Sequence, residues 1–337
     1  MVSAAIDSGA LRHNLRQVRQ WAPKSRVMAV IKANAYGHGL VTVARALGSA
    51  DAFAVARVDE GLTLRGAGIM TRTVLLEGVF DAAQLAAAAA AGFELVVHTR
   101  EQLELLRAAP AGARFTVWLK LDSGMNRLGF KGADFGAAYA ALGAVAAVQQ
   151  PVNLFTHLSS ADDPERAATP GQLARFAAAT ESLPGERSIA NSAGMLSYRE
   201  AQADWVRPGL LLYGASPFFG SVGADYGLKP AMTLRSQVIA LKDLEAGERV
   251  GYGDGYPRSL ASGAPVLVNG ERVPLAGRVS MDMIGIDVTD LQAQPALGDP
   301  VILWGEGLAV EELAVWADTI PYELLCGISQ RVAVDLR

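Results

Sequence analysis

The 337-residue sequence predicts an α/β fold: a TIM-like (β/α)8 barrel followed by a mostly β C-terminal domain. Apolar residues make up 51% of the chain and charged residues 19%, so a large core can be buried. Over the first two-thirds, short apolar runs alternate with helical patterns. Eight such units are typical of a barrel whose site lies at the carboxyl ends of its strands. A doubly wound sheet is the main alternative, because pattern alone seldom fixes topology.

The barrel elements follow from short apolar runs bounded by turn residues. The expected strands are residues 27–33, 52–57, 73–77, 94–98, 115–121, 152–157, 188–191 and 210–213. Helical patterns lie between them, as at 59–67 and 101–109. The alanine-rich run 82–92 is expected to be a barrel helix, because alanine is the best helix former. The barrel domain is therefore expected to span residues 1–229.

Residues 230–337 are expected to form the separate, mostly β domain. Here the sequence breaks into short β-like runs at 232–244, 265–281, 284–291 and 300–305. Asn269-Gly270 between two such runs is typical of a tight hairpin turn.

Composition argues against several classes of function. The net charge is −4 with both signs interspersed and no basic stripe, so no nucleic-acid partner is expected. No apolar stretch is long enough to cross a membrane, and residues 1–14 lack the apolar core of a signal peptide. The single cysteine, Cys326, fits a reducing cytoplasm. The four histidines show no zinc-ligand spacing, so no metal site is expected.

Residues 27–39, VMAVIKANAYGHG, are the most informative stretch. Lys32 follows a buried strand and should lie at the barrel mouth. Asn34 and two glycines then break the chain, with Tyr36 and His38 expected at the same mouth. A lysine in a desolvated pocket can bind pyridoxal phosphate (PLP) covalently through its amine. The alternative is an ordinary surface lysine, and spacing alone favours neither.

Several longer segments resolve this choice. KANAYGHG, KLDSGMNRLGF (120–130), WVRPGLLLYG (205–214), GYGDGYPR (251–258) and GRVSMDM (277–283) resemble the alanine racemases, in the order that family has them and almost from end to end. The resemblance implies a cytoplasmic, PLP-dependent homodimer that makes D-alanine for peptidoglycan. It also implies that an N-terminal strand, here 2–6, joins the β domain.

The resemblance assigns two bases, because inverting Cα needs one on each face. Lys32 serves one face, and Tyr252 from the β domain of the partner subunit serves the other. Positioned acid–base groups of this kind are typically worth ~10²–10⁴ in rate. The Met281 backbone N–H and the nearby Asp282 match substrate-side positions of the same domain, so the active sites would be composite.

Cofactor binding is also implied residue by residue. Arg207 matches the family residue beside the pyridine nitrogen, where a permanently protonated group cannot accept the ring proton; the alternative is an ordinary buried ion pair. His157 matches a histidine behind the ring, the alternative being a satisfied core histidine. The phosphate would be held by hydroxyl groups and backbone N–H groups of Tyr36, Ser192, Gly209, Leu210 and Tyr322.

Arg127 matches an arginine near the substrate carboxylate. Lys120 matches a lysine that can be carbamylated in the family and then holds that arginine in place. A simple surface pair between Lys120 and Asp122 is the alternative, since a sequence cannot show a modification.

The sequence departs from the family at residues 246–258, AGERVGYGDGYPR. Two stretches that the family keeps apart are merged here, and roughly 20 residues are missing, enough for two strands and a turn. Tyr252 therefore aligns with either the catalytic or the entryway tyrosine. We assign it to the catalytic position, with Tyr256 as the fallback. The departure leaves open a PLP-binding protein with impaired or no turnover. A racemase of broader amino-acid range is a second alternative, because the same site residues would permit it.

Overall fold

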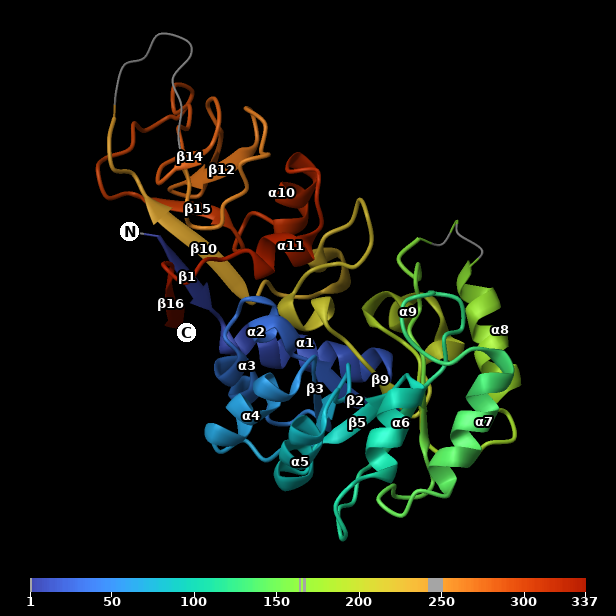
Figure 1. The fold of residues 1–337 in the computed structure, drawn as a ribbon. Helices are drawn as coiled ribbons and strands as arrows, with labels where there is room; N and C mark the ends of the chain where they lie inside the picture. Colours follow the sequence, from blue (N-terminus) through green and yellow to red (C-terminus); the bar gives the residue numbers. More distant parts are fainter. Residues whose placement is uncertain (1, 164, 166–167, 242–250) are drawn as a thin grey trace.

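The N-terminal part of the molecule is a closed barrel of parallel strands (Figure 1). The computed structural model describes residues 2–163, 165, 168–241 and 251–337. The barrel strands are β2 (Arg26–Val30), β3 (Ala52–Val55), β4 (Thr73–Leu75), β5 (Glu94–Val97), β6 (Val117–Lys120), β7 (Asn153–Phe155), β8 (Arg187–Ser188) and β9 (Trp205–Val206). The first of them, β2, pairs with both β3 and β9, which closes the cylinder. The predicted barrel is confirmed, and the doubly wound sheet is wrong.

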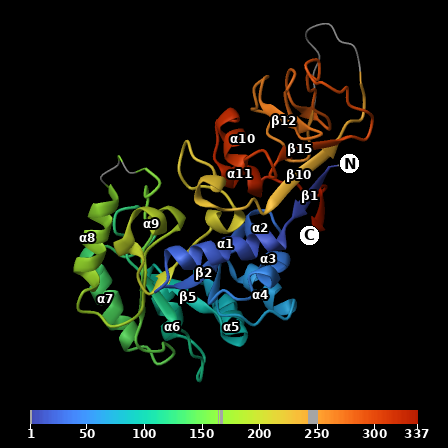
Figure 2. The ribbon, with the colours of Figure 1, turned by 180° about the vertical axis from the view of Figure 1, so that it is seen from behind.

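Helices cover the outside of the barrel (Figures 1 and 2). They are α1 (Ser8–Trp21), α3 (Leu40–Ala46), α4 (Val58–Gly66), α5 (Ala82–Ala91), α6 (Arg100–Arg107), α7 (Gly132–Gly143), α8 (Ala168–Thr180) and α9 (Ser192–Ser197), with a 3₁₀ turn, η1 (Arg199–Ala201). Local sequence sets their ends. Asp81 caps the alanine-rich α5 by accepting a hydrogen bond from Gln84 N (2.8 Å), and Gly92 ends it with φ 64°.

The eighth strand lies earlier than the sequence predicted. It is β9, whereas residues 210–213 form a buried 3₁₀ turn, η2 (Leu210–Tyr213). Gly209 has φ −115° and ψ −86°, outside the strand region, and Gly214 closes the turn with φ 86°. Periodicity cannot distinguish a short buried strand from a buried helical turn, which explains the error. Arg207 consequently follows the strand directly, at the carboxyl end where barrel sites lie.

The C-terminal part is built on a six-stranded sheet in the order β13-β12-β15-β10-β1-β16. Its strands are β1 (Ser3–Ile6), β10 (Met232–Gln237), β12 (Pro265–Val268), β13 (Glu271–Pro274), β15 (Pro300–Trp304) and β16 (Ala333–Leu336). The N-terminal strand β1 lies between β10 and β16 (Figure 1). Asn269 and Gly270 form the predicted hairpin turn, and both have positive φ.

Three smaller features complete this part of the molecule. Two-residue strands β11 (Gly251–Tyr252) and β14 (Ser280–Met281) form a separate parallel pair. Helices α10 (Val310–Trp316) and α11 (Pro321–Cys326) pack on the barrel side of the sheet (Figures 1 and 2), and a 3₁₀ turn, η3 (Gly223–Tyr226), precedes β10. Across residues 2–163, 165, 168–241 and 251–337, no helix combines the length and hydrophobicity that a transmembrane span requires.

Buried contacts join the two parts. Helix α11 packs on the turn α2 (Lys32–Tyr36), and Gly37 approaches the Leu325 carbonyl so closely that a side chain there would collide with it. The Glu311 carboxylate of α10 accepts hydrogen bonds from Ser216 N (2.7 Å) and Gly223 N (2.8 Å). The barrel mouth is thus attached to α11 of the same chain.

Candidate active site

The turn that begins with Lys32 is left-handed. Ala33, Asn34 and Ala35 have φ 53° and Tyr36 has φ 52°, a run that non-glycine residues rarely adopt. Such strain persists only where surrounding contacts impose it, and it concentrates at functional sites. Here the Asn34 side chain accepts a hydrogen bond from Leu40 N (2.9 Å), and Gly37 closes the turn with φ 81°.

Glu60 is a supporting residue that sequence reasoning missed. Its carboxylate accepts hydrogen bonds from Ala33 N (2.6 Å) and from Ala56 N (2.8 Å). It therefore ties the residue after Lys32 to the end of the neighbouring strand β3. An acidic residue in the first turn of a barrel helix is the only sequence signal, and capping explains that signal equally well.

The structure brings Tyr36, Tyr322, Ser192, Gly209 and Leu210 together at the mouth. The Tyr36 ring lies 5.6 Å from the Tyr322 ring, and the Ser192 hydroxyl accepts a hydrogen bond from Gly209 N (3.0 Å). A Cβ on Gly209 would lie 2.7 Å from the Tyr36 hydroxyl, so the backbone and this phenol meet where only glycine fits. Leu210, next in the chain, is buried.

Burial raises the pKa values of both phenols, that of Tyr322 to about 12. The hydroxyl groups therefore stay protonated at neutral pH and can donate hydrogen bonds to an anion. His38, expected at the same mouth, is instead fully buried against Tyr213 (ring centroids 4.5 Å apart). Burial lowers the pKa of His38 to about 4, so it is a neutral core residue.

Arg207 is a buried guanidinium held by neutral acceptors. It donates hydrogen bonds to Thr156 O (2.6 Å), to the Ser188 hydroxyl (2.7 Å) and to Ile189 O (3.1 Å). Its guanidinium carbon lies 3.9 Å from the centre of the Phe155 ring. Burial lowers its pKa to about 9, which keeps it protonated at neutral pH. Among the described residues it contacts no carboxylate, so the buried ion pair considered from sequence is not observed there.

Lys120 and His157 flank this arginine. Arg207 Nη2 lies 3.4 Å from His157 Nδ1. Lys120 is 6% exposed and lies over the Phe155 ring, so it is not the surface partner of Asp122. The Asp122 carboxylate instead accepts hydrogen bonds from Gly124 N and Asn126 N.

The electrostatics of the mouth favour an anionic ligand. Burial, followed by the charges of Arg127, Arg207 and Lys32, lowers the pKa of Lys120 to about 8. Burial and the same cations, joined by Lys120, hold the pKa of His157 well below its usual range. Lys32, Lys120, Arg127, His157 and Arg207 thus share one region, and Arg127 is exposed within it. A bound anion would relieve this clustering of positive charge.

The substrate-side residues expected in the second domain lie away from the barrel mouth of the same chain. Met281 is 55% exposed on β14, which Figure 1 shows at the side of the C-terminal domain away from the barrel strands. Asp282 forms an ion pair with Arg331. The backbone of Tyr252 belongs to β11, but its side chain and residues 242–250, including the AGERV context, lie outside the described residues.

Tyr256, the fallback base, is in the core of the C-terminal domain. It is 3% exposed and stacks on Trp304 with ring centroids 6.0 Å apart. Burial raises the pKa of its phenol well above 10. A tyrosine packed in this way cannot reach a substrate, so the fallback assignment is wrong.

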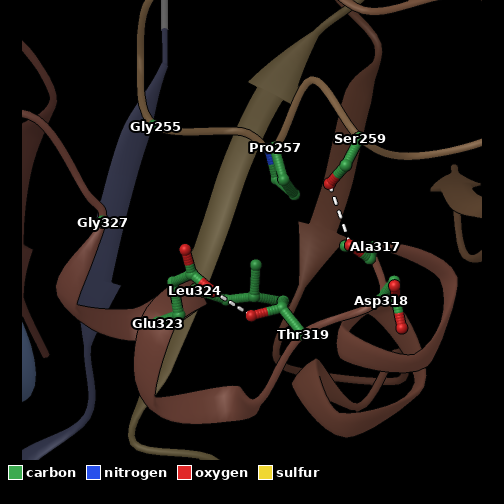
Figure 3. A pocket seen from close by; sticks show the side chains of 9 residues that line it. All are labelled: Gly255, Pro257, Ser259, Ala317, Asp318, Thr319, Glu323, Leu324 and Gly327. Carbon is green, nitrogen blue, oxygen red and sulfur yellow. Dashed lines mark hydrogen bonds between the residues drawn. The ribbon is translucent and has the colours of Figure 1, made fainter.

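A cavity of about 470 Å³ lies between the loop after β11 and helices α10 and α11 (Figure 3). Ser259 donates a hydrogen bond to the Ala317 carbonyl across its rim (2.9 Å), and Thr319 contacts the Glu323 carboxylate. Asp318 and Glu323 give its wall negative charge, which would repel a phosphate or a carboxylate. The cavity is therefore distinct in character from the cation-rich barrel mouth.

The fold and the mouth residues define a barrel enzyme with a lysine and a cluster of cations at the carboxyl ends of its strands. The family model "Alanine racemase, N-terminal domain" matches residues 6–217, and "Alanine racemase, C-terminal domain" matches residues 249–335. The chain belongs to the alanine racemase family.

Individual proteins agree with this assignment. An alanine racemase from Shewanella loihica is 47% identical over 352 residues, covering 99% of this chain and 98% of that protein. A biosynthetic alanine racemase from Shigella dysenteriae is 48% identical and covers 98% of each chain. The crystal structure of biosynthetic alanine racemase from Pseudomonas aeruginosa superposes with a TM-score of 0.95 at 41% identity, covering 100% of this chain and 99% of that one. Alanine racemase from Acinetobacter baumannii gives 0.93 at 37% identity, with the same coverage.

The alignments also bear on chain length. Each of the two sequence alignments extends over 352 positions, whereas this chain has 337 residues. At least 15 aligned positions of each relative therefore have no residue here. This chain is therefore shorter than the two relatives, which agrees in direction with the shortening inferred from the merged segment.

Proposed function

We propose that this chain is a cytoplasmic, PLP-dependent homodimer that interconverts L- and D-alanine and supplies D-alanine for peptidoglycan. The observation that carries the proposal is the site at the barrel mouth. There, Lys32 shares one region with Arg127 and Arg207, beside two protonated phenols and a glycine against which the Tyr36 hydroxyl rests. Membership of the family and the names of its relatives support the reaction.

The residues present fit PLP. Tyr36, Tyr322, Ser192 and the backbone N–H groups of Gly209 and Leu210 would hold the phosphate, because the missing side chain of Gly209 lets the backbone come close to the Tyr36 phenol. Lys32 would hold the cofactor covalently. When bound, PLP delocalises the negative charge that develops when Cα of the amino acid loses its proton.

Protons at the other end of the cofactor would be controlled by Arg207. Its pKa of about 9 keeps the guanidinium protonated at neutral pH, so it would donate a hydrogen bond to the pyridine nitrogen of bound PLP and would not supply that nitrogen with a proton. His157, neutral because of burial and nearby cations, would pack behind the ring. This arrangement favours return of a proton to Cα over prolonged charge storage in the ring.

Two groups would move the Cα proton. Lys32 Nζ would exchange it on one face and the Tyr252 phenol of a partner subunit on the other. The composite site is supported by the position of β11 and β14, on the side of their domain away from the barrel strands (Figure 1). Arg127 would bind the substrate carboxylate, with the Met281 N–H and Asp282 on the opposite wall. Lys120, with a pKa of about 8, has the neutral amine population that reaction with carbon dioxide requires, which supports its carbamylation.

The test is a D-amino-acid assay on purified, PLP-loaded protein with L-alanine and several other L-amino acids. Formation of D-alanine well above D-serine or D-valine would support the proposal. Comparable rates for several amino acids would point to a broad-range racemase. The shortening relative to the relatives specifically favours one further candidate, a PLP-binding protein with impaired turnover. Tight PLP binding without any D-product would establish that candidate.

A further inference from the structure

The short strand pair β11–β14 aligns the two C-terminal motifs that the proposed function needs. In its register Tyr252 lies opposite Met281, and Gly253 N donates a hydrogen bond to the Met281 carbonyl. The pair has two residues on each strand and is separate from the six-stranded sheet. A two-stranded unit this short is marginal alone, so its alignment must depend on contacts that flank it.

Arg331 supplies such contacts to both strands at once. Its Nε lies 2.7 Å from Asp254 Oδ1, and its Nη2 lies 2.6 Å from Asp282 Oδ1. Asp254 is two residues after Tyr252, and Asp282 directly follows Met281. One guanidinium therefore bridges the two chain segments just where they leave the strand pair.

The backbone directly after β11 leaves no room for a side chain beside the same guanidinium. A Cβ on Gly253 would lie 2.7 Å from Arg331 Nη1 and 2.5 Å from the Met281 carbonyl oxygen. No side chain fits between the loop and the guanidinium without a shift of one of them. Arg331 thus binds Asp254 through Nε and Asp282 through Nη2, while its Nη1 occupies the space that a side chain at residue 253 would need.

Arg331 is itself fixed to the main sheet. The buried Val332 follows it, and strand β16 after that pairs with β1. Ser329 N donates a hydrogen bond to the Asp254 carbonyl (3.3 Å). The Arg331 and Asp282 side chains are about half exposed, so their charge attraction alone is weak. The contact differs from an ordinary surface ion pair because one planar guanidinium holds two carboxylates in a fixed geometry.

We propose that Arg331 is a positioning residue that sets the Tyr252 and Met281 backbones relative to each other and thereby places the second base. The inference rests on the proposed function, in which Tyr252 is that base. Without the arginine, two carboxylates would face each other across a marginal strand pair, and their repulsion would separate the segments.

The test compares Arg331→Met and Arg331→Lys with a matched control, Arg272→Met. Arg272 forms a two-point ion pair with Glu312 in the same domain (2.6 and 2.9 Å), and its hydrogen bonds to described residues include none to β11 or β14. Arg331→Met should lower kcat by about 10- to 100-fold, since small misplacements of a catalytic group are costly. PLP binding should change little. The kcat of Arg331→Lys should lie between those of the parent and Arg331→Met, because an ammonium keeps the charge but cannot bind both carboxylates as the planar guanidinium does.

Backbone hydrogen exchange of the PLP-loaded protein gives a readout independent of turnover. Exchange in peptides covering 251–255 and 280–283 should quicken in Arg331→Met and remain unchanged in Arg272→Met. If Arg331→Met fails to fold, Asp282→Asn removes one arm of the bridge and should give the same pattern more weakly. Unchanged exchange in the folded variant would overturn the proposal.

A Tyr252→Phe background separates this inference from the proposed function. If Arg331 acts through Tyr252, Arg331→Met should cost little further activity in Tyr252→Phe. If Tyr252→Phe is slow and Arg331→Met is fully active despite faster exchange, the positioning role is overturned while the second base stands. If Tyr252→Phe is fully active, the second base in the proposed function fails, and the positioning role fails with it.

Discussion

Gly209→Ala should weaken PLP binding without unfolding the barrel. A Cβ at this position would lie 2.7 Å from the Tyr36 hydroxyl and 3.3 Å from the ring carbon that bears it. The Tyr36 ring packs between Tyr213 and Tyr322, with centroids 4.8 and 5.6 Å away, so it cannot retreat freely. Overpacking of this kind costs about 1–3 kcal/mol. Bound PLP would fix Tyr36 in this position, whereas the free site can relax around the new methyl group. The cost would therefore fall mainly on the bound form and raise the dissociation constant of PLP by about 5- to 150-fold.

The measurement is a PLP titration of cofactor-free protein, followed by absorbance or fluorescence. Gly136→Ala is the matched control, since a Cβ there meets nothing within 4 Å and the residue lies in α7. It should leave PLP affinity unchanged and stabilise the helix by about 0.5–1 kcal/mol. In the Gly209→Ala background, Tyr36→Phe removes the colliding oxygen and should cost less affinity than it does alone.

Two results would refute this reasoning. Unchanged PLP affinity in folded Gly209→Ala would mean that the close approach of Gly209 to Tyr36 does not form part of the cofactor site. Strictly additive losses in the double variant would mean that the Tyr36 hydroxyl is not what the new methyl group meets.

Three further predictions concern buried charge. Arg207→Glu should slow racemisation by roughly 10²-fold and change the visible spectrum of bound PLP, because a buried carboxyl can hold a proton that the guanidinium cannot accept. In urea unfolding, Glu311→Ala should cost about 2–3 kcal/mol by leaving the Ser216 and Gly223 amides unpaired, whereas Glu311→Gln, which keeps the accepting oxygen, should cost much less. The pKa of Lys120 is about 8 in the folded protein, below its value in the unfolded chain. The folded state is therefore destabilised progressively as the pH falls from the unfolded pKa to the folded one. With carbon dioxide excluded, so that Lys120 of the parent carries no carbamate, urea unfolding of cofactor-free Lys120→Met should therefore show a gain in stability over the parent of roughly 3 kcal/mol at pH 7 that shrinks toward pH 10.

The barrel was predictable because burial on both faces leaves a clear apolar run for each strand. The run at 210–213 misled for the same reason, since buried helical turns and buried strands share that composition. What distinguishes them is the backbone at Gly209, which no periodicity reports. The fold class therefore followed from sequence although one strand was misplaced.

The positions of the candidate site residues could be predicted where a distinctive segment ends a strand, and could not be predicted where tertiary contacts decide. Lys32 and Arg207 stand in distinctive segments at strand ends. Glu60 was missed because its partners are backbone amides, which carry no sequence signal. Tyr256 was misjudged because its burial against Trp304 depends on the packing of distant strands. His38 was likewise placed by spacing at a mouth that its ring does not reach.

The central claim, that Lys32 holds PLP at the barrel mouth, can be tested by chemical fixation. Borohydride treatment of the PLP-loaded protein, followed by proteolysis and mass spectrometry, identifies the amine to which the cofactor is attached. Lys120 provides an internal comparison for Lys32, because it is a buried lysine of the same cation cluster. Its pKa of about 8 means that it loses its proton more readily than an ordinary lysine does. The account predicts label on the peptide containing Lys32 alone, and loss of that label in Lys32→Ala. Label on Lys120, or on any lysine away from the mouth, would contradict it.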